Sequence, residues 1–174
     1  PRWRSTNIPT SAPSLETARS RSTVTSAAVG GSSAPANTSE SPSRHRSADG
    51  GRNWERRGLD DSQHISRIVI HPEDSDTIYV AAQGPLWTPG GDRGFFRSTD
   101  GGATWTKTLG DDEYTGVTDI VMDPRDPDVI YAATWEHHRT VAAYMGGGPG
   151  TRIHRSEDGG MTWRELGQHA SGGL

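Results

Sequence analysis

The 174-residue chain contains no cysteine, and only 30% of its residues are hydrophobic and 7% aromatic. Without cysteine it has neither disulfides nor thiolate chemistry, although this does not settle its cellular compartment. No apolar run approaches the roughly 20 residues of a membrane-spanning helix, so we expect no membrane contact from this segment. The formal net charge is −4, whereas a nucleic-acid surface needs a clustered basic face, so we expect no nucleic-acid partner.

One eight-residue pattern occurs three times, at residues 47–54, 98–105 and 156–163. The aspartates of successive copies are 51 and 58 residues apart, and a repeat of that size indicates one multi-stranded unit per copy. The residues expected to build the copies are Ser47, Asp49, Gly51 and Trp54 in the first, Ser98, Asp100, Gly102, Thr104 and Trp105 in the second, and Ser156, Asp158, Gly160, Thr162 and Trp163 in the third.

Each copy predicts a tight turn between two β-strands. Paired glycines allow the positive φ angles that short hairpin turns require, and the aspartate can accept hydrogen bonds from the N–H groups of the turn. We expect this carboxylate to be buried, the serine and threonine hydroxyls to bond across the hairpin, and the tryptophan to fill space between neighbouring sheets. In the first copy Asn53 replaces the threonine, which leaves open whether the corresponding bond forms. The predicted role of all three copies is structural.

A second repeat lies between the octapeptides. Residues 67–82 align with residues 119–134 at an offset of 52, and half of the sixteen positions are identical. Each segment has two β-branched and aromatic runs around a turn rich in proline and aspartate, which is typical of a β-hairpin. With the octapeptide hairpin this gives four strands per unit. The predicted strands are 65–71, 77–83, 93–98 and 103–109 in the first unit, and 116–123, 128–134, 151–156 and 161–167 in the second.

Four short strands per repeat, without sustained helical spacing, are typical of a β-propeller blade. The sequence therefore predicts an all-β fold, a β-propeller fragment with two complete four-stranded blades at 65–109 and 116–167, within a region spanning 44–174. The outer hairpin of a preceding blade is expected at 44–58. Because propellers close into rings of roughly 4–8 blades, we expect the chain to be a fragment of a longer protein. Residues 1–43 are rich in Ser, Thr, Ala, Arg and Pro, and are predicted to be a disordered or a mistranslated low-complexity segment.

The octapeptide resembles the Asp-box, or BNR repeat, and residues 44–174 resemble bacterial BNR-repeat proteins similar to the sortilin N-terminal domain. Besides the boxes, the resemblance is carried by segments 64–72, 82–87, 115–119 and 147–150. It implies that the boxes are structural and that the protein is secreted or periplasmic. We expect no cofactor. Sialidases and xyloglucan-cleaving propellers share the repeat. The resemblance thus implies either a scaffold that binds a protein, peptide or glycan, or a glycoside hydrolase whose catalytic residues lie mostly outside this fragment. A third alternative is an assembly-factor propeller like those that serve photosystem II.

Two long loops, 83–94 and 135–150, are predicted to share one rim of the blades, opposite the boxes. Loops on a rigid scaffold commonly carry binding sites. Aromatic plates with arginine and carboxylate groups nearby suit sugar rings or an extended peptide. The predicted binding residues are Trp87, Arg93, Trp135, Glu136, His138, Arg139 and Tyr144, and His137 lies among them in the sequence.

Acidic residues on the same rim could supply one member of the carboxylate pair that a glycosidase uses. These are Asp60, Asp61, Asp111, Asp112, Glu113 and Glu136, although acidic pairs in surface turns are more commonly only solvated. Arg67 and Asp119 occupy equivalent repeat positions and should face the same way, either as an ion pair across the blade boundary or as charges that line the central channel. Metal binding by His137 and His138 is not expected, because consecutive residues of an extended chain point to opposite sides.

Overall fold

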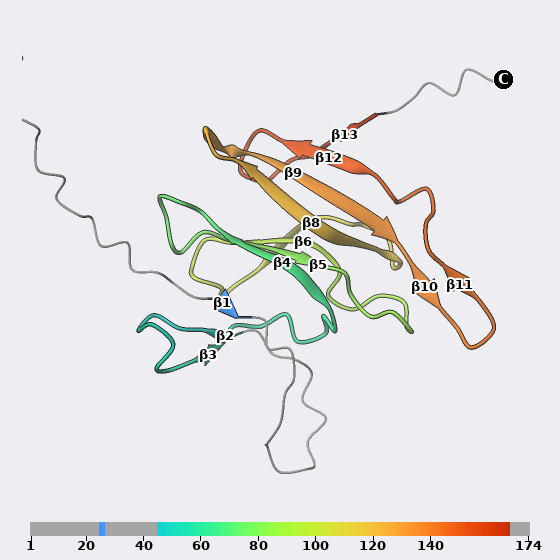
Figure 1. The fold of residues 1–174 in the computed structure, drawn as a ribbon, viewed down its shortest axis with the longest axis horizontal. Helices are drawn as coiled ribbons and strands as arrows, with labels where there is room; N and C mark the ends of the chain where they lie inside the picture. Colours follow the sequence, from blue (N-terminus) through green and yellow to red (C-terminus); the bar gives the residue numbers. More distant parts are fainter. Residues whose placement is uncertain (1–24, 27–44, 168–174) are drawn as a thin grey trace, which may run out of the picture.

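The structure of the chain, a computed structural model, describes residues 25–26 and 45–167, and all regular secondary structure among these residues is β (Figure 1). Apart from residues 25–26, the segment 1–43 lies outside the described residues, and the expectation for it stays a prediction. A three-stranded sheet contains β1 (Thr25–Ser26), β2 (His45–Arg46) and β3 (Glu55–Arg56).

Two four-stranded antiparallel sheets make up most of the fold. The first blade has the order β4-β5-β6-β7, and the second has the order β8-β9-β12-β13. The predicted all-β propeller fragment, with two complete blades and the outer hairpin of a preceding blade, is confirmed. The bounds are β4 (Ile65–Ile70), β5 (Ile78–Ala82), β6 (Gly94–Ser98) and β7 (Thr106–Leu109), then β8 (Thr115–Asp123), β9 (Asp126–Glu136), β12 (Ile153–Ser156) and β13 (Arg164–Leu166).

The second blade differs from the sequence-based expectation at one loop. The stretch 135–150 was expected to be irregular, but β9 runs on to Glu136 because its last residues still pair with Thr115 and Gly116 of β8. A small hairpin then follows, formed by β10 (His138–Arg139) and β11 (Tyr144–Met145). The loop is therefore an ordered extension of the blade.

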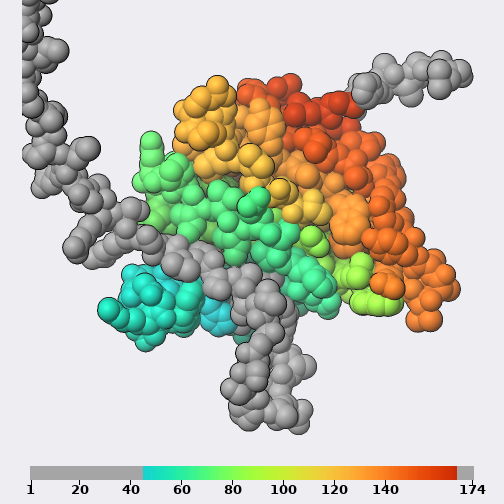
Figure 2. All heavy atoms as spheres, in the orientation of Figure 1, coloured from blue at the N-terminus to red at the C-terminus, as the bar shows by residue number. Residues whose placement is uncertain are grey.

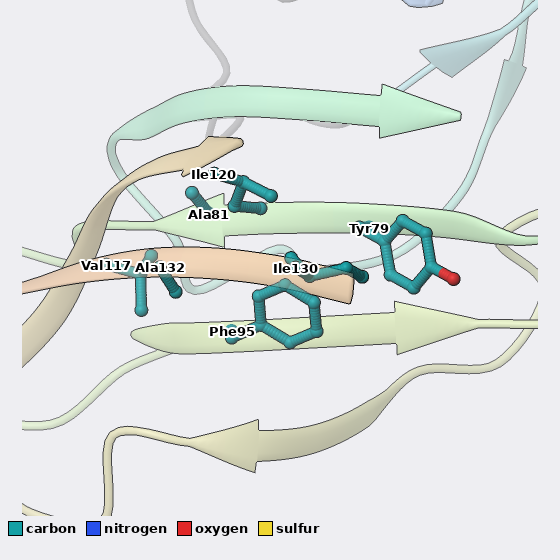
Figure 3. Close-up of a cluster of buried hydrophobic side chains, with 7 residues drawn as sticks. All are labelled: Tyr79, Ala81, Phe95, Val117, Ile120, Ile130 and Ala132. Carbon is teal, nitrogen blue, oxygen red and sulfur yellow. The ribbon is translucent and has the colours of Figure 1, made fainter. Parts of the chain in front are cut away.

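The hydrophobic core lies between the two blades, which are stacked face to face (Figure 1). Because alternate residues of a strand face opposite sides, Tyr79 and Ala81 of β5 point to the second blade while Ile78 and Val80 point to the β2–β3 side. Figure 3 shows the cluster between the blades, which contains Tyr79, Ala81, Phe95, Val117, Ile120, Ile130 and Ala132. Burial of each large side chain in such a cluster contributes about 1.5–3 kcal/mol.

The opposite ends of the blades carry different kinds of connection. At one end the octapeptide turns bond to the β4–β5 and β8–β9 turns, since Gly101 N donates to Asp76 O and Gly159 N donates to Asp128 O, each at 2.9 Å. We call this end the turn rim. The other end, the loop rim, consists of residues 57–64, 83–93, 110–114 and 135–152, the last of which begins with the end of β9.

Candidate functional site

The octapeptide turns use their polar groups within the turn. The buried hydroxyl of Ser98 accepts a hydrogen bond from Gly102 N at 2.8 Å and donates to Asp100 Oδ1 at 2.8 Å. Ser47 and Ser156 make the same pair of bonds in the other two copies. The expectation of buried carboxylates is wrong, because all three aspartates are exposed and only the serine is enclosed.

Local hydrogen bonds hold these exposed aspartates in the charged form. The hydroxyls of Thr104 and Thr162 donate to Asp100 and Asp158, and they are the main cause of the lowered pKa of both carboxyls. In the first copy, the side-chain amide of Asn53 donates to Asp49 in place of the hydroxyl. The backbone N–H of Asn53 is the main cause that lowers the pKa of Asp49 to about 2. The asparagine therefore supplies a substitute bond.

The loop rim contains a cleft of about 300 Å³ between the two blades. The segment around Leu86 from the first blade meets the β10–β11 hairpin of the second, because Arg139 N donates to Leu86 O at 2.9 Å. Figure 2 shows the lime-coloured loop of the first blade against the orange hairpin. The residues that line the cleft are His64, Gln83, Leu86, Trp135, His137, Arg139 and Tyr144.

Of the predicted binding residues, Trp135, Arg139 and Tyr144 line this cleft, and Trp87 lies beside it in contact with Arg139. The guanidinium carbon of Arg139 lies 5.1 Å from the ring centroid of Trp87, which is cation–π geometry. Trp87 is nevertheless 53% exposed, and Tyr144, which pairs with Arg139 in the β10–β11 hairpin, is also exposed. An indole face, a phenol and a cation are thus available to a ligand.

Arg93 was predicted to contact a ligand, but its side chain is only 1% exposed. Its guanidinium donates four hydrogen bonds to main-chain carbonyls at 2.6–3.1 Å, those of Pro85, Thr88, Gly90 and Tyr114. Burial lowers the pKa of Arg93. Arg93 therefore fixes the shape of two loops under the cleft and does not reach its surface.

Trp135 and the residues after it form the wall that belongs to the second blade. The rings of Trp135 and His137 stack with centroids 4.4 Å apart, and Trp135 Nε1 donates to Gly146 O. His137 is buried, which lowers its pKa. His138 turns the other way and contacts the ring of Tyr114 edge-on at 5.0 Å. The two histidines face opposite sides, as the extended chain predicts.

The carboxylates of the loop rim bond mainly to the loops themselves. Glu136 Oε2 accepts from Gly150 N at 2.7 Å, and Asp112 Oδ1 accepts from the N–H groups of Tyr114 and Thr115 at 2.7 Å. Asp60 forms an ion pair with Arg56 at 2.7 Å. None of the carboxylates named as candidates lines the cleft, and residues 25–26 and 45–167 contain no cluster of three or more histidine or acidic side chains suited to a metal ion.

Sequence reasoning missed His64, Gln83 and Leu86 as residues of the cleft. His64 ends the connection that precedes β4, and Gln83 directly follows β5. Gln83 N donates to His64 O at 2.8 Å, so the two positions close the end of the first blade. The sequence signal that could have identified His64 and Gln83 is that each lies next to the end of a predicted strand on the loop rim.

Of the two alternatives for the equivalent repeat positions, the structure has the ion pair. Arg67 Nε donates to Asp119 Oδ1 at 2.7 Å, which joins β4 of the first blade to β8 of the second. The bond to Arg67 lowers the pKa of Asp119, and both side chains are about half exposed. Surface pairs of this kind contribute only about 0–1 kcal/mol.

Within the part of the chain that the structure describes, no helix has the length and hydropathy of a membrane span.

Solved structures that resemble this chain are β-propeller enzymes. An ancestral GH74 enzyme aligns with a TM-score of 0.54 and 20% identity over 74% of this chain and 16% of its own. The GH74 xyloglucanase from Xanthomonas campestris aligns with a TM-score of 0.37 and 15% identity, and the GH74 enzyme from Niastella koreensis with a TM-score of 0.34 and 18% identity. Each alignment covers 74% of this chain and 27% of the other. The chain thus spans a small part of these proteins, and the first likeness supports the fold alone.

No curated protein matches the sequence. The family model Sortilin-Vps10, described as "Sortilin, neurotensin receptor 3", matches residues 43–172, which include both blades and the β2–β3 hairpin. A match over most of the sequence, on a fold of repeated four-stranded antiparallel sheets, shows that the chain belongs to the Sortilin-Vps10 family.

Proposed function

We propose that this chain is part of a propeller that binds a peptide or a glycan in the loop-rim cleft, without cleaving it there. The observation that carries the proposal is an exposed group of three side chains: Arg139 and Tyr144 line the cleft, and Arg139 lies over the exposed ring of Trp87 next to it. An exposed indole and phenol offer flat apolar surface with few rotatable bonds, and a guanidinium adds directed hydrogen bonds. These are groups that recur at the centres of binding interfaces.

The charge of the cleft supports a ligand that carries negative charge. Its lining includes one arginine, Arg139, and no carboxylate, while the lowered pKa of His137 leaves that ring uncharged at neutral pH. Beneath the cleft, the buried guanidinium of Arg93 bonds to four neutral carbonyls, and the nearby carboxylates of Asp112 and Glu113 offset part of its charge. The positive charge at the cleft therefore comes mainly from Arg139.

Hydrolysis of a glycan is the second candidate, because an ancestral GH74 enzyme shares the fold. A glycosidase needs two carboxylates about 5–9.5 Å apart across the scissile bond. The carboxylates of Glu136 and Asp112 on this rim are occupied by backbone N–H groups. This favours binding over cleavage at this cleft, and the family description, which names a receptor, points the same way.

Titration calorimetry of the chain with acidic peptides, acidic oligosaccharides and neutral xyloglucan oligosaccharides tests the proposal. For a probe that binds, Arg139→Ala and Trp87→Ala should each weaken binding at least about tenfold, which corresponds to roughly 1.4 kcal/mol. Arg125→Ala, on the turn rim, is the matched control and should bind like the parent chain. Equal loss in all three variants, or loss in none, would contradict a site at this cleft.

Cleavage is checked on the same mixtures by measuring reducing ends released from the bound oligosaccharide. The binding proposal expects none from this chain. Release that disappears in Glu136→Gln would instead support the hydrolase, since this change keeps the size of the side chain and removes its charge.

A further inference from the structure

The segment 146–150, which contains four glycines and one proline, forms a strap between β11 and β12 on the loop rim. Unlike the glycines of the octapeptide turns, none of these four glycines has a positive φ. Glycine is also used where the main chain has to approach other groups closely. We therefore asked which side chains lie against the strap.

Two of the strap glycines lie directly over side chains of the second blade. A Cβ built on Gly148 would overlap with the carboxylate of Glu136, and one on Gly150 would overlap with the hydroxyl of Thr115. A Cβ on Gly147, in contrast, would meet no atom closer than 4.0 Å outside the adjacent residues. The strap thus fits over Glu136 because position 148 has no side chain, whereas position 147 has room for one.

Three consecutive residues at the end of β9 fasten this strap. Thr134 Oγ1 donates to Gly150 O at 2.6 Å, and Glu136 Oε2 accepts from Gly150 N at 2.7 Å. Trp135 Nε1 donates to Gly146 O at 3.1 Å. Thr134 and Glu136 therefore hold one end of the strap, and the indole of Trp135 bonds to the other.

The end of the strap at Gly146 supports two aromatic side chains of the cleft. A Cβ on Gly146 would lie 2.8 Å from the ring of Tyr144, so this ring packs directly against the main chain there. The indole of Trp135, which stacks on His137, bonds to the same residue. Trp135 and Tyr144 line the cleft, whereas Glu136 does not. The strap therefore connects Glu136 to the cleft wall of the second blade.

We infer that Glu136 is a positioning residue, which fixes the aromatic wall of the loop-rim cleft through the strap. As a determinant of ligand binding, this role rests on the proposed function. Its carboxylate keeps the strap where Trp135 and Tyr144 present their rings to the cleft, and side chains that are ordered before binding do not lose affinity to ordering during it. The role requires an oxygen acceptor at position 136 and not its charge, which separates it from the catalytic carboxylate of a glycosidase.

Hydrogen exchange of the Trp135 indole N–H, measured by NMR on the ligand-free chain, tests the connection. Gly148→Ala places a methyl group against Glu136, so the strap has to move away and the exchange should become at least about tenfold faster. Gly147→Ala makes the same chemical change at the adjacent residue, where there is room, and this matched control should exchange like the parent chain. Equal exchange in all three proteins, or equal acceleration in both variants, would overturn the inference.

Calorimetric titration of variants at position 136 separates the acceptor from the charge. Glu136→Ala removes the acceptor of Gly150 N, whereas Glu136→Gln keeps an oxygen there. For a probe that binds to the parent chain, Glu136→Ala should weaken binding at least about tenfold and Glu136→Gln by less than about threefold. Equal weakening in both variants, or none in Glu136→Ala, would overturn the inference.

A double variant shows whether Glu136 and Gly148 act through the same strap. Glu136→Ala combined with Gly148→Ala should bind no more weakly than Glu136→Ala alone, because both changes release one segment. Losses that add would overturn the inference. An absence of binding by every probe would contradict the proposed function instead, and the exchange rates of the ligand-free chain would still show whether Glu136 sets the position of Trp135.

Discussion

The turn rim and the loop rim belong to the same two blades, yet they are held together in different ways. On the turn rim, the three octapeptides make nearly the same hydrogen bonds, and most of their partners lie two to four residues apart. On the loop rim, bonds join distant segments, such as Gly90 N to Glu113 O and Arg139 N to Leu86 O. The repeated rim is defined by local sequence, and the variable rim is defined by the contact between blades.

This difference separates folding from recognition. A turn that satisfies its own carboxylate and hydroxyls has few groups left for a ligand, so repeating it adds stability to each blade. Loops that depend on long-range contacts can change their surface residues while a buried support is kept. In this chain the support is Arg93, and the surface residues above it are Trp87, Arg139 and Tyr144.

The largest effect is expected from removing the support of the loop rim. Arg93→Ala removes the buried guanidinium that donates to four main-chain carbonyls. Each buried hydrogen-bond partner that is lost costs about 1–3 kcal/mol. We expect the free energy of unfolding to fall by at least about 3 kcal/mol. Urea denaturation followed by tryptophan fluorescence measures this. Arg125→Ala removes a largely exposed arginine and should cost little, so a similar loss in both variants would remove the distinction between the rims.

The turn rim should respond less to loss of its buried hydroxyl. Ser98→Ala deletes one acceptor of Gly102 N inside the first blade, and we expect a loss of about 1–3 kcal/mol. Ser47→Ala makes the same change in the β2–β3 hairpin, which can open without unfolding the blades, so global stability should fall less. Urea denaturation of both variants provides the comparison. Equal losses would mean that the hairpin unfolds together with the blades.

How much of each rim could be predicted from the sequence depends on whether its contacts are local or long-range in the chain. The turns, the strand order and the Arg67–Asp119 pair could be predicted because they depend on neighbouring residues or on one repeat offset. The role of Arg93 could not, since four carbonyls from segments 85–90 and 114 converge only after folding. His64 joins the cleft for the same reason. The prediction that the octapeptide carboxylates are buried was wrong, because the serine, and not the aspartate, fills the inside of the turn.

The two rims should also lose stability in different pH ranges. Burial lowers the pKa of His137 below its unfolded value near 6.5, with Arg93, His64 and His138 acting in the same direction, so the unfolded state binds more protons below that pH. Stability contributed by the loop rim is therefore complete above about pH 6.5 and falls as the pH drops. On the turn rim, the pKa values of the aspartates are lower in the folded state than in the unfolded state. Stability should therefore fall as the pH drops from about 4, the unfolded pKa, to the folded pKa, which for Asp49 is about 2.

Urea denaturation from neutral to acidic pH resolves these two ranges. His137→Phe should reduce the loss in the upper range and leave the lower one, because it removes one titrating ring and keeps an aromatic partner for Trp135. Burial also lowers the pKa of His154, which accounts for the loss that remains in the upper range. Asp100→Asn should reduce only the lower range, since Asp100 is held charged by the Thr104 hydroxyl. If the free energy of unfolding falls with pH in the same way in the parent chain and in both variants, other groups control the loss of stability in acid.

The smallest effect is expected from making the first octapeptide like the other two. In Asn53→Thr a hydroxyl replaces the amide that donates to Asp49, so one hydrogen bond is exchanged for another at an exposed site, and stability should change by less than about 0.5 kcal/mol. The pKa of Asp49 should nevertheless fall below about 2, because the threonine hydroxyl is the main cause of the lowered pKa of Asp100 and Asp158. Carbon-13 NMR titration of the Asp49 carboxyl measures this, with Asn53→Ala as the control, where loss of the side-chain bond should raise the pKa. If the threonine and alanine variants titrate alike, the side chain at this position does not set the charge of the turn, and the backbone N–H groups alone would account for it.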